Sequence, residues 1–250
     1  MRVAAIYDVH GNQPALEAVL QEIRAAEVDK IVVGGDVVPG PMPREALECL
    51  LALDLPVQFI QGNGEVAVLA AMAGRDSTSL PEQAREAVQW TARQLHSNHE
   101  RLMASWPKTL RVEIPGLGTV LFCHATPRSD TEIFTRLTPA DRVLPAFSGI
   151  DAPLVVCGHT HMQFDRIIGN IRVVNAGSIG MPFGEPGAYW LLLDGEVRLR
   201  RTPYDLTAAA ERIRATTYPA AKEFAAQNIL QPPSEAAMLE LFGRAEVRKR

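Results

Sequence analysis

The first sixty residues alternate short apolar runs with segments in which apolar residues recur at helical spacing. Residues 2–8, 30–36 and 56–63 are apolar runs that end in polar residues, a pattern typical of buried strands. Residues 13–28 and 43–53 show helical spacing, and the second of these segments begins with a proline, which suits a first helical turn. Strands that alternate with helices predict a mainly parallel sheet with helices on its faces.

The pattern changes after a long helical segment, which we predict as one helix from Pro81 to Ser105. Beyond it, apolar runs follow one another closely and are separated by the turn sequences PGLG, GN and DG. Such turns predict antiparallel hairpins. The strands are expected at residues 109–114, 119–124, 154–159, 164–178 and 189–201.

The last part of the chain is rich in alanine and helical in pattern. It begins at Asp205 and is interrupted at Pro232 and Pro233. The chain has 250 residues, of which 47% are hydrophobic, and this is enough for one domain with a large core. We therefore predict a domain at residues 1–204 and a C-terminal helical extension at residues 205–250 that packs on the core or on a partner.

Charge and cysteine content narrow the functional classes. The net charge is −4 and no long basic block lies inside the chain, so there is no strong signal for nucleic-acid binding. Neither a signal-peptide pattern nor an apolar run of bilayer length is seen, and no membrane association is expected. Cys49, Cys123 and Cys157 have no CxxC spacing, which favours a reducing compartment. These observations predict a cytoplasmic protein, and they are compatible with a homo-oligomer.

Polar residues of metal-ligand type follow almost every predicted strand. Because the carboxyl ends of strands form the ligand-binding edge of open α/β sheets, we expect these side chains to meet there. Four of the six histidines belong to this set, whereas His96 and His99 are expected on the surface of the long helix. The candidate metal ligands are Asp8, His10, Asp36, Asn63, His124, His159 and His161.

The spacing of these residues favours two metal ions. In an extended segment, residues i and i+2 point to the same side, so Asp8 and His10 are predicted to hold one ion together. His159 and His161 could do the same, or a loop could direct them to two neighbouring ions. Singly, such residues are more commonly turn or cap residues. As a set they exceed one tetrahedral zinc site and suit two ions that share a carboxylate, with Asp36 as the bridge. Paired ions suit the hydrolysis of phosphate esters.

The sequences DVHGN, GGD, GN, CH and GHTH, in this order, resemble the motifs of the calcineurin-like metallophosphoesterase superfamily. The likeness covers most of the chain and leaves out the helical tail. The sequences FCHATPRSDTEIF and NAGSIGMPFGEPGAYWLLL further resemble a bacterial branch of small, single-domain phosphodiesterases. The resemblance implies an α/β fold in which two mixed sheets pack as a sandwich flanked by helices.

The resemblance also implies a set of roles at the metal centre. A hydroxide between two ions would attack phosphorus directly, and the substrate would be a small phosphate ester. Carboxylate, amide and imidazole donors without thiolate fit Mn, Fe, Zn, Co or Ni, and manganese is the metal that we expect. The predicted catalytic residues are Asp36, Asn63 and His124. By this resemblance, one ion would be bound by Asp8, His10 and His161, the other by Asn63, His124 and His159, and both by Asp36.

One position departs from the pattern of the superfamily. Many members carry a histidine after the GN motif, where it is thought to assist the leaving group, but this chain has Gly64. Since a glycine side chain cannot donate a proton, we expect phosphodiesters or activated aryl esters to be preferred. Glu65 is a candidate to replace the missing acid in part, although the sequence does not place its side chain. The alternatives are a phosphoprotein or dinucleoside-polyphosphate phosphatase and a non-catalytic metal-binding scaffold.

Other residues are weaker candidates for the site. Asn12 and Arg128 are the substrate-binding candidates, although Asn12 equally suits a helix N-cap and Arg128 a solvated loop. Asn175 is expected to support the site from behind the ligands, and Cys123 and Cys157 are expected in the core. Specificity is expected to come from residues 39–44 and 181–186 and from the helical tail.

Overall fold

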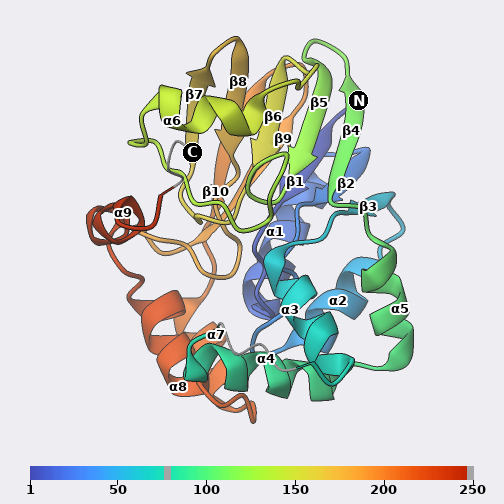
Figure 1. The fold of residues 1–250 in the computed structure, drawn as a ribbon. Helices are drawn as coiled ribbons and strands as arrows, with labels where there is room; N and C mark the ends of the chain where they lie inside the picture. Colours follow the sequence, from blue (N-terminus) through green and yellow to red (C-terminus); the bar gives the residue numbers. More distant parts are fainter. Residues whose placement is uncertain (76–79, 247–250) are drawn as a thin grey trace.

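The computed structural model describes residues 1–75 and 80–246, which form two five-stranded sheets with helices on their outer faces (Figure 1). The first sheet has the strand order β10-β9-β1-β2-β3 and the second β4-β5-β6-β8-β7. The strands are β1 (Val3–Ile6), β2 (Lys30–Val33), β3 (Val57–Phe59), β4 (Thr109–Ile114), β5 (Gly118–Cys123), β6 (Leu154–Cys157), β7 (Phe164–Ile168), β8 (Ile171–Asn175), β9 (Ala188–Leu193) and β10 (Val197–Thr202).

Strand β1 shows why the apolar runs are continuous. Val3 and Ala5 pack between the two sheets, whereas Ala4 and Ile6 face the helices that cover the first sheet. A strand that is buried on both faces needs apolar side chains at every position. The strand β1 pairs in parallel with β2, and β2 with β3, while β4–β5, β7–β8 and β9–β10 are antiparallel hairpins. The predicted sandwich of two mixed sheets is confirmed.

Helices cover both outer faces of the sandwich. The first sheet packs against α1 and α2, and the second against α6 and the short 3-10 helix that follows it. Cys123 and Cys157 are buried beneath this second layer, as predicted. The helices before the tail are α1 (Gln13–Ala25), α2 (Pro43–Leu51), α3 (Asn63–Met72), α4 (Glu82–Gln94), α5 (Ser97–Ser105), α6 (Ala140–Val143) and the 3-10 helix (Leu144–Phe147).

The prediction of one helix from Pro81 to Ser105 is wrong. The structure has two helices, α4 and α5, and the backbone between them is extended at Leu95, where ψ is 153°. The side chain of Leu95 is buried in the core beneath the first sheet. The chain therefore leaves helical geometry at a point where doing so buries a leucine, which helical periodicity alone does not reveal.

The expected surface position of His99 is also wrong, whereas His96 is exposed as predicted. His99 is only 3% exposed, and its Nδ1 accepts a hydrogen bond from the backbone N–H of His96 at 3.3 Å. Its Nε2 lies 3.5 Å from a carboxylate oxygen of Glu48 on α2. His99 thus lies in the first turn of α5 and caps the backbone at His96 where the helix starts, so its role is structural.

The tail contains α7 (Leu206–Arg214), α8 (Ala221–Phe224) with a π-helical segment (Ala225–Leu230), and α9 (Glu235–Gly243). The break between the last two contains Pro232 and Pro233, as predicted. Arg212 of α7 pairs with Glu17 of α1 at 2.6 Å, which ties the tail to the first helix. The division at residues 204 and 205 stays a prediction.

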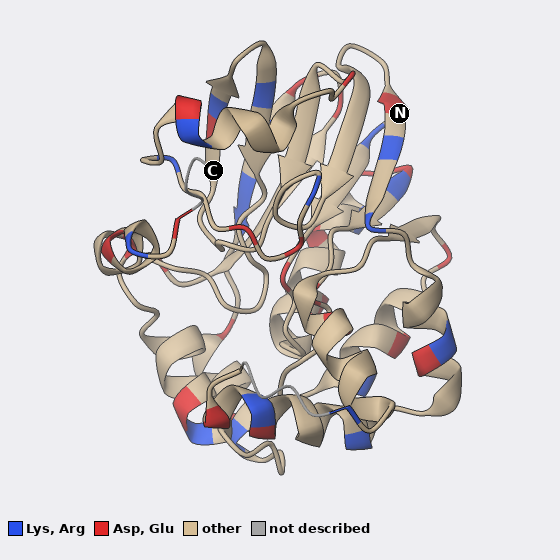
Figure 2. Ribbon diagram, in the orientation of Figure 1, with Lys and Arg blue, Asp and Glu red and all other residues tan. Residues whose placement is uncertain are grey.

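The charged residues are spread over the molecule. Figure 2 shows Lys and Arg interspersed with Asp and Glu on helices and strands alike, in keeping with a chain that lacks a long basic block. Among the described residues, no helix is both long enough and apolar enough to cross a membrane.

Candidate metal centre

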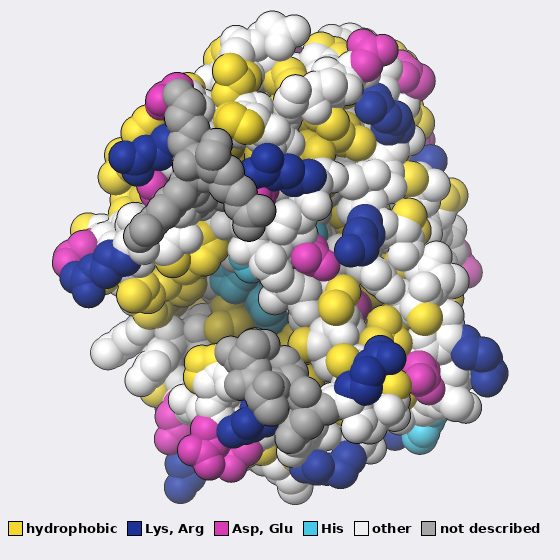
Figure 3. Space-filling view, in the orientation of Figure 1, with side chains coloured by type: hydrophobic (Ala, Val, Ile, Leu, Met, Phe, Trp, Pro, Cys, Tyr) yellow, Lys and Arg dark blue, Asp and Glu magenta, His cyan; other side chains and the backbone are white. Residues whose placement is uncertain are grey.

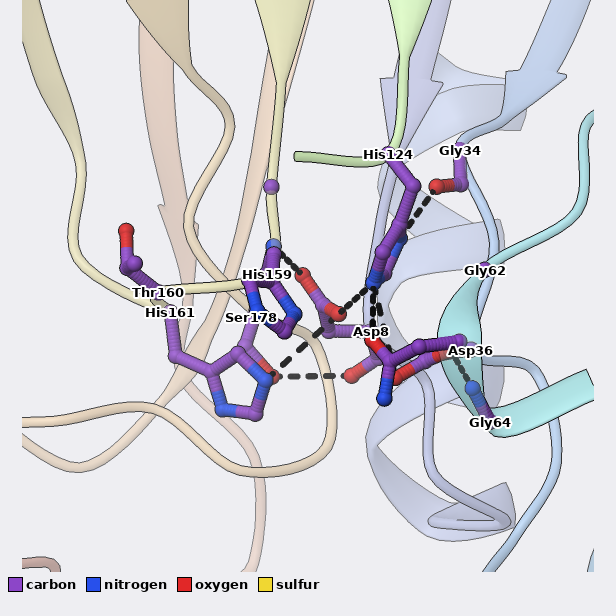
Figure 4. Close-up of polar contacts among 12 residues, drawn as sticks. Asp8, Gly34, Asp36, Gly62, Gly64, His124, His159, Thr160, His161 and Ser178 are labelled. Carbon is purple, nitrogen blue, oxygen red and sulfur yellow. Dashed lines mark hydrogen bonds and ion pairs between the residues drawn. The ribbon is translucent and has the colours of Figure 1, made fainter. Parts of the chain in front are cut away.

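The seven candidate ligands come together where strands of both sheets end, and Figure 4 labels Asp8, Asp36, His124, His159 and His161 among them. Asp8 and His10 follow β1, Asp36 follows β2, and His124 follows β5. The remaining three lie after β6 and at the start of α3. Figure 4 shows the labelled carboxylates and imidazoles pointing toward one another from both sheets. The predicted convergence at the carboxyl edge is therefore what the structure contains.

The ligands are brought together by left-handed backbone, and not by the extended segments that their spacing predicted. Asp8 and His10 do not lie in an extended segment, because their φ angles are 53° and 48°. Asp36, His159 and His161 are also left-handed, with φ of 54°, 65° and 57°. A non-glycine residue in this region costs about 1–3 kcal/mol, and such residues cluster at functional sites. The prediction that i and i+2 share a face of an extended strand is wrong, and left-handed loops aim the side chains instead.

Each of the two aspartates has one oxygen held by the backbone and one directed at histidines. Asp8 Oδ2 accepts the N–H of His159 at 2.9 Å, and Asp36 Oδ1 accepts the N–H of Gly64 at 2.7 Å. Asp8 Oδ1 is buried without a hydrogen-bond partner and lies 3.5 Å from Nε2 of His161. Asp36 Oδ2 lies 3.6 Å from Nε2 of His124. The backbone therefore orients both carboxylates before any ligand binds.

Three of the histidines are oriented by carbonyl groups. Nδ1 of His124 lies 2.9 Å from Gly34 O, Nδ1 of His161 lies 2.7 Å from Met181 O, and Nδ1 of His10 lies 3.3 Å from Pro39 O. A carbonyl can only accept, so these contacts assign the proton to Nδ1 and leave Nε2 unprotonated in the neutral ring. This second hydrogen bond is the one that metal-binding histidines characteristically make.

The donor atoms form two overlapping groups, each within 4.8 Å, that fit metal ions. The orphaned and buried Oδ1 of Asp8 belongs to a carboxylate present in both groups, and a cation would give it the partner that the protein does not provide. Judged by distance alone, Asp8 is therefore also a candidate, beside Asp36, for the carboxylate that bridges two metal ions. The groups are Asp8, His10 and His161, and Asp8, Asp36 and His124.

Asn63 and His159 lie beside the second group. Asn63 Oδ1 is 2.9 Å from Nε2 of His124, and the ring of His159 is 5.1 Å from the ring of His124 between centroids. Both therefore border the position that the resemblance assigns to the second ion.

Burial disfavours the charged forms of these side chains, and the neighbouring charged groups decide whether each pKa is raised or lowered. Burial raises the pKa of Asp8, but the histidines around it, His161 first, outweigh that effect and hold its pKa below the usual range. The two carboxylates raise the pKa of His124 and His161 although burial lowers it. For His159, burial and the neighbouring His124 lower the pKa to about 4. The carboxylates on one side and His124 and His161 on the other thus stabilise each other's charged forms.

The family of the chain follows from its sequence as a whole. The model of the calcineurin-like phosphoesterase superfamily domain matches residues 1–196, the part of the chain that builds the metal centre and most of both sheets. The chain belongs to the calcineurin-like phosphoesterase superfamily. Membership in this superfamily supports a phosphoric ester hydrolase that depends on metal ions.

Individual relatives match most of the chain. An uncharacterized protein of Methanocaldococcus jannaschii, MJ0912, is 30% identical over 232 residues, which cover 84% of this chain and 91% of that protein. A metallophosphoesterase from Sphaerobacter thermophilus has a TM-score of 0.71 at 30% identity and covers 90% of this chain and 99% of its own. The hypothetical protein PH1004 from Pyrococcus horikoshii OT3 has a TM-score of 0.78 at 22% identity, covering 93% and 99% of the two chains, and shows the same fold.

Within this superfamily, the glycine after the GN motif has a steric explanation here. A Cβ on Gly64 would lie 2.5 Å from Cδ of Pro39, 2.7 Å from Val38 O and 2.8 Å from Oδ1 of Asp36. Residues 38–39 thus fill the space that a side chain at position 64 would need. The shape of this loop therefore explains why position 64 holds a glycine and not a histidine.

Glu65 does not replace the missing acid. Its two carboxylate oxygens accept four hydrogen bonds, from the backbone N–H groups of Asp36, Val37, Val38 and Gly62. Burial and the Asp36 carboxylate raise the pKa of Glu65 to about 7, but its side chain has no exposed surface from which to reach a substrate. Glu65 instead holds the loop that carries Asp36 against the start of α3.

The two substrate-binding candidates are engaged within the protein. Asn12 is fully buried and caps α1, since its Oδ1 accepts the N–H of Ala15 at 3.2 Å. Arg128 pairs with Glu132, with Nε 2.8 Å from Oε1, and borders a cavity of about 30 Å³ that His124 also lines. The structure thus gives Asn12 the capping role that its sequence position also suited, and it places Arg128 next to the metal centre.

Sequence reasoning identified Asn175 but missed the contacts of the segment that follows it. Asn175 Nδ2 donates to Gly158 O at 2.6 Å and to Oγ1 of Thr160 at 3.1 Å, so it holds the turn that carries His159 and His161. Residue Phe183 stacks on the ring of His161 with centroids 5.3 Å apart. Position 183 lies in a loop expected to influence specificity, but no local pattern marked this ring as a neighbour of the metal centre.

Proposed function

We propose that this chain hydrolyses phosphate esters, and phosphodiesters in preference to monoesters, at a centre of two divalent metal ions. The observation that carries the proposal is the pair of buried aspartates. Each has one oxygen clamped by a backbone N–H and the other facing imidazole nitrogens, and Oδ1 of Asp8 has no hydrogen-bond partner. A buried carboxylate in this state is costly unless a cation completes its surroundings.

The residues divide between the two ions as the superfamily resemblance implies. When bound, the ions would supply positive charge for the phosphoryl oxygens and lower the pKa of a bound water. Asp36 Oδ2 lies 3.8 Å from Nε2 of His10 and 3.6 Å from Nε2 of His124, one residue from each proposed set. Asp8 Oδ1 lies 3.9 Å from the same two nitrogen atoms, so the choice of Asp36 as the bridge rests on the resemblance. The first ion would take Asp8, His10 and His161, and the second Asn63, His124 and His159.

The expected preference among esters rests on the proton that an alkoxide leaving group requires. Position 64 has no room for a side chain, and Glu65 is committed to four backbone N–H groups. A phosphomonoester with a poor leaving group would therefore react without an acid from either position. Activated aryl esters, whose leaving groups depart as stable anions, are least affected by this lack.

The test is a substrate panel on protein stripped with EDTA and reloaded with manganese. We expect turnover of bis(4-nitrophenyl) phosphate and a lower kcat/KM for alkyl phosphomonoesters than for comparable diesters. Asp36→Asn should abolish turnover, whereas Asp54→Asn, an exposed aspartate after α2, should behave as the wild type. A much higher kcat/KM on alkyl monoesters would contradict the diester preference. No turnover with Mn, Fe, Zn, Co or Ni would favour the non-catalytic scaffold.

A further inference from the structure

The helix α9 has the composition of a buried helix but is not buried. Its sequence EAAMLELFG is apolar around most of its circumference, and none of its residues is buried. Leu241, for example, is 54% exposed. A helix that is apolar on most sides is normally enclosed by protein or by membrane. An apolar surface left open beside a reaction centre is typical of a site that receives an apolar group.

This helix is joined to the metal centre by aromatic rings. The ring of Phe183 stacks on His161 with centroids 5.3 Å apart and planes at 19°. Phe242 of α9 meets Phe183 edge-on, with centroids 5.9 Å apart and planes at 62°. Both phenylalanine side chains are partly exposed. The row His161, Phe183 and Phe242 therefore runs from a proposed metal ligand out to the surface of the tail.

The space-filling view places an apolar surface at the same location. In Figure 3 the surface is hollowed, cyan histidines lie in the hollow, and hydrophobic side chains gather between them and the region of α9. A ligand that reaches the histidines from this side would pass along apolar groups.

The position of α9 is held by polar contacts near its N-terminal end. The N–H of Gly184 donates to Pro233 O at 2.8 Å, which joins the loop of Phe183 to the start of α9. Arg136 pairs with Glu235 of α9 at 2.9 Å. These contacts fix α9 against the loop of Phe183 and against Arg136. The ring of Phe242 is therefore in place before a ligand binds and need not be ordered by it.

We propose that Phe183 and Phe242 form an aromatic subsite that takes a planar apolar substituent of the phosphate ester. This inference rests on the proposed function, because the phosphate must be held at the metal centre for its substituent to reach the rings. Phenyl rings attract other aromatic groups in offset or edge-to-face arrangements, so a planar aryl or heteroaromatic group is the favoured occupant. The subsite would distinguish esters by the group that stays on phosphorus, in addition to the group that leaves.

The test compares two diesters that share one leaving group. Bis(4-nitrophenyl) phosphate and methyl 4-nitrophenyl phosphate both release 4-nitrophenolate, but they keep an aryl and a methyl group respectively. With manganese-loaded full-length protein, Phe242→Ala and Phe183→Leu should each lower the ratio of kcat/KM for the aryl ester to that for the methyl ester by about two- to tenfold. The change should fall mainly on KM. Leu51→Ala, which removes an exposed apolar side chain from α2, should leave the ratio unchanged.

The possible outcomes distinguish a missing subsite from a missing phosphoesterase activity. Phe242 lies on a helix without buried residues, so its replacement should leave the far-UV circular dichroism spectrum unchanged. A wild-type protein that hydrolyses both esters, with a ratio that neither phenylalanine variant alters, would overturn the subsite alone. A wild-type protein that hydrolyses neither ester with any of the five metals would overturn the proposed function and the subsite with it.

Discussion

Adding a single methyl group at Gly64 tests whether the loop after β2 leaves no space for a side chain. In the Gly64→Ala variant, the new Cβ would stand 2.5 Å from Cδ of Pro39 and 2.7 Å from Val38 O. It would also stand 2.8 Å from Oδ1 of Asp36, the oxygen that the N–H of Gly64 holds. A proline ring, a backbone carbonyl and a clamped carboxylate cannot simply rotate away. The variant must therefore move the loop or the carboxylate.

The expected cost is the difference between two opposing effects. Overpacking of this kind costs about 1–3 kcal/mol, and three simultaneous contacts below 3 Å place Gly64 in the upper half of that range. Alanine is favoured over glycine within a helix by about 1 kcal/mol, which offsets part of this at the start of α3. The free energy of unfolding should therefore fall by about 1–2 kcal/mol. Gly243→Ala is the matched control, because Gly243 is helical and its Cβ would meet nothing within 4 Å. It should not lose stability.

The assay is urea unfolding of EDTA-treated protein, followed by far-UV circular dichroism and read as a shift in midpoint at constant slope. As a functional companion, Gly64→His should not gain activity on an alkyl phosphomonoester, whose leaving group needs a proton, because the imidazole cannot enter without displacing Pro39 or Asp36. If Gly64→Ala is as stable as the wild type, the claim that position 64 has no space for a side chain is refuted. It is refuted equally if Gly64→His raises kcat/KM for the monoester.

Three further predictions concern the site and its pH and metal dependence. Asn175→Ala should lower the free energy of unfolding by about 2–4 kcal/mol, because the buried N–H of Gly177 loses its acceptor and Gly158 O loses a donor; an unchanged urea midpoint would contradict it. In metal-free protein, the lowered pKa of His159, about 4, means that the unfolded chain binds a proton that the folded state excludes. This contribution to stability is present above the unfolded pKa of about 6.5 and is lost as pH falls toward 4, so His159→Gln should flatten the decline in stability over this range, as followed by urea unfolding. Manganese at a hundred times its dissociation constant should raise the free energy of unfolding by about 2.7 kcal/mol, and no rise in Tm on titration would count against a folded-state metal site.

The sequence was most informative where short-range pattern and burial coincide. Strands such as β1 and β6 are apolar at every position because both of their faces are covered, and the polar residues that follow them mark the edge of the sheet. The candidate ligands could therefore be assigned to one place without coordinates. The long helix was mispredicted because the break at Leu95 depends on a core contact and not on a glycine or proline.

What the sequence by itself determined is the set of strands, the order of the motifs and the identity of the groups that converge after them. These follow from local periodicity and from the rule that parallel strands end at one edge. Only the tertiary structure decided how the groups are aimed. The left-handed backbone at Asp8 and His10 is stabilised by hydrogen bonds to the neighbouring loop, in which Asp8 N–H donates to Gly35 O and His10 N–H to Asp36 O. The contact between Phe183 and Phe242 joins residues far apart in the chain, so no local pattern encodes it. Such features depend on which distant segments meet, and that is settled by packing.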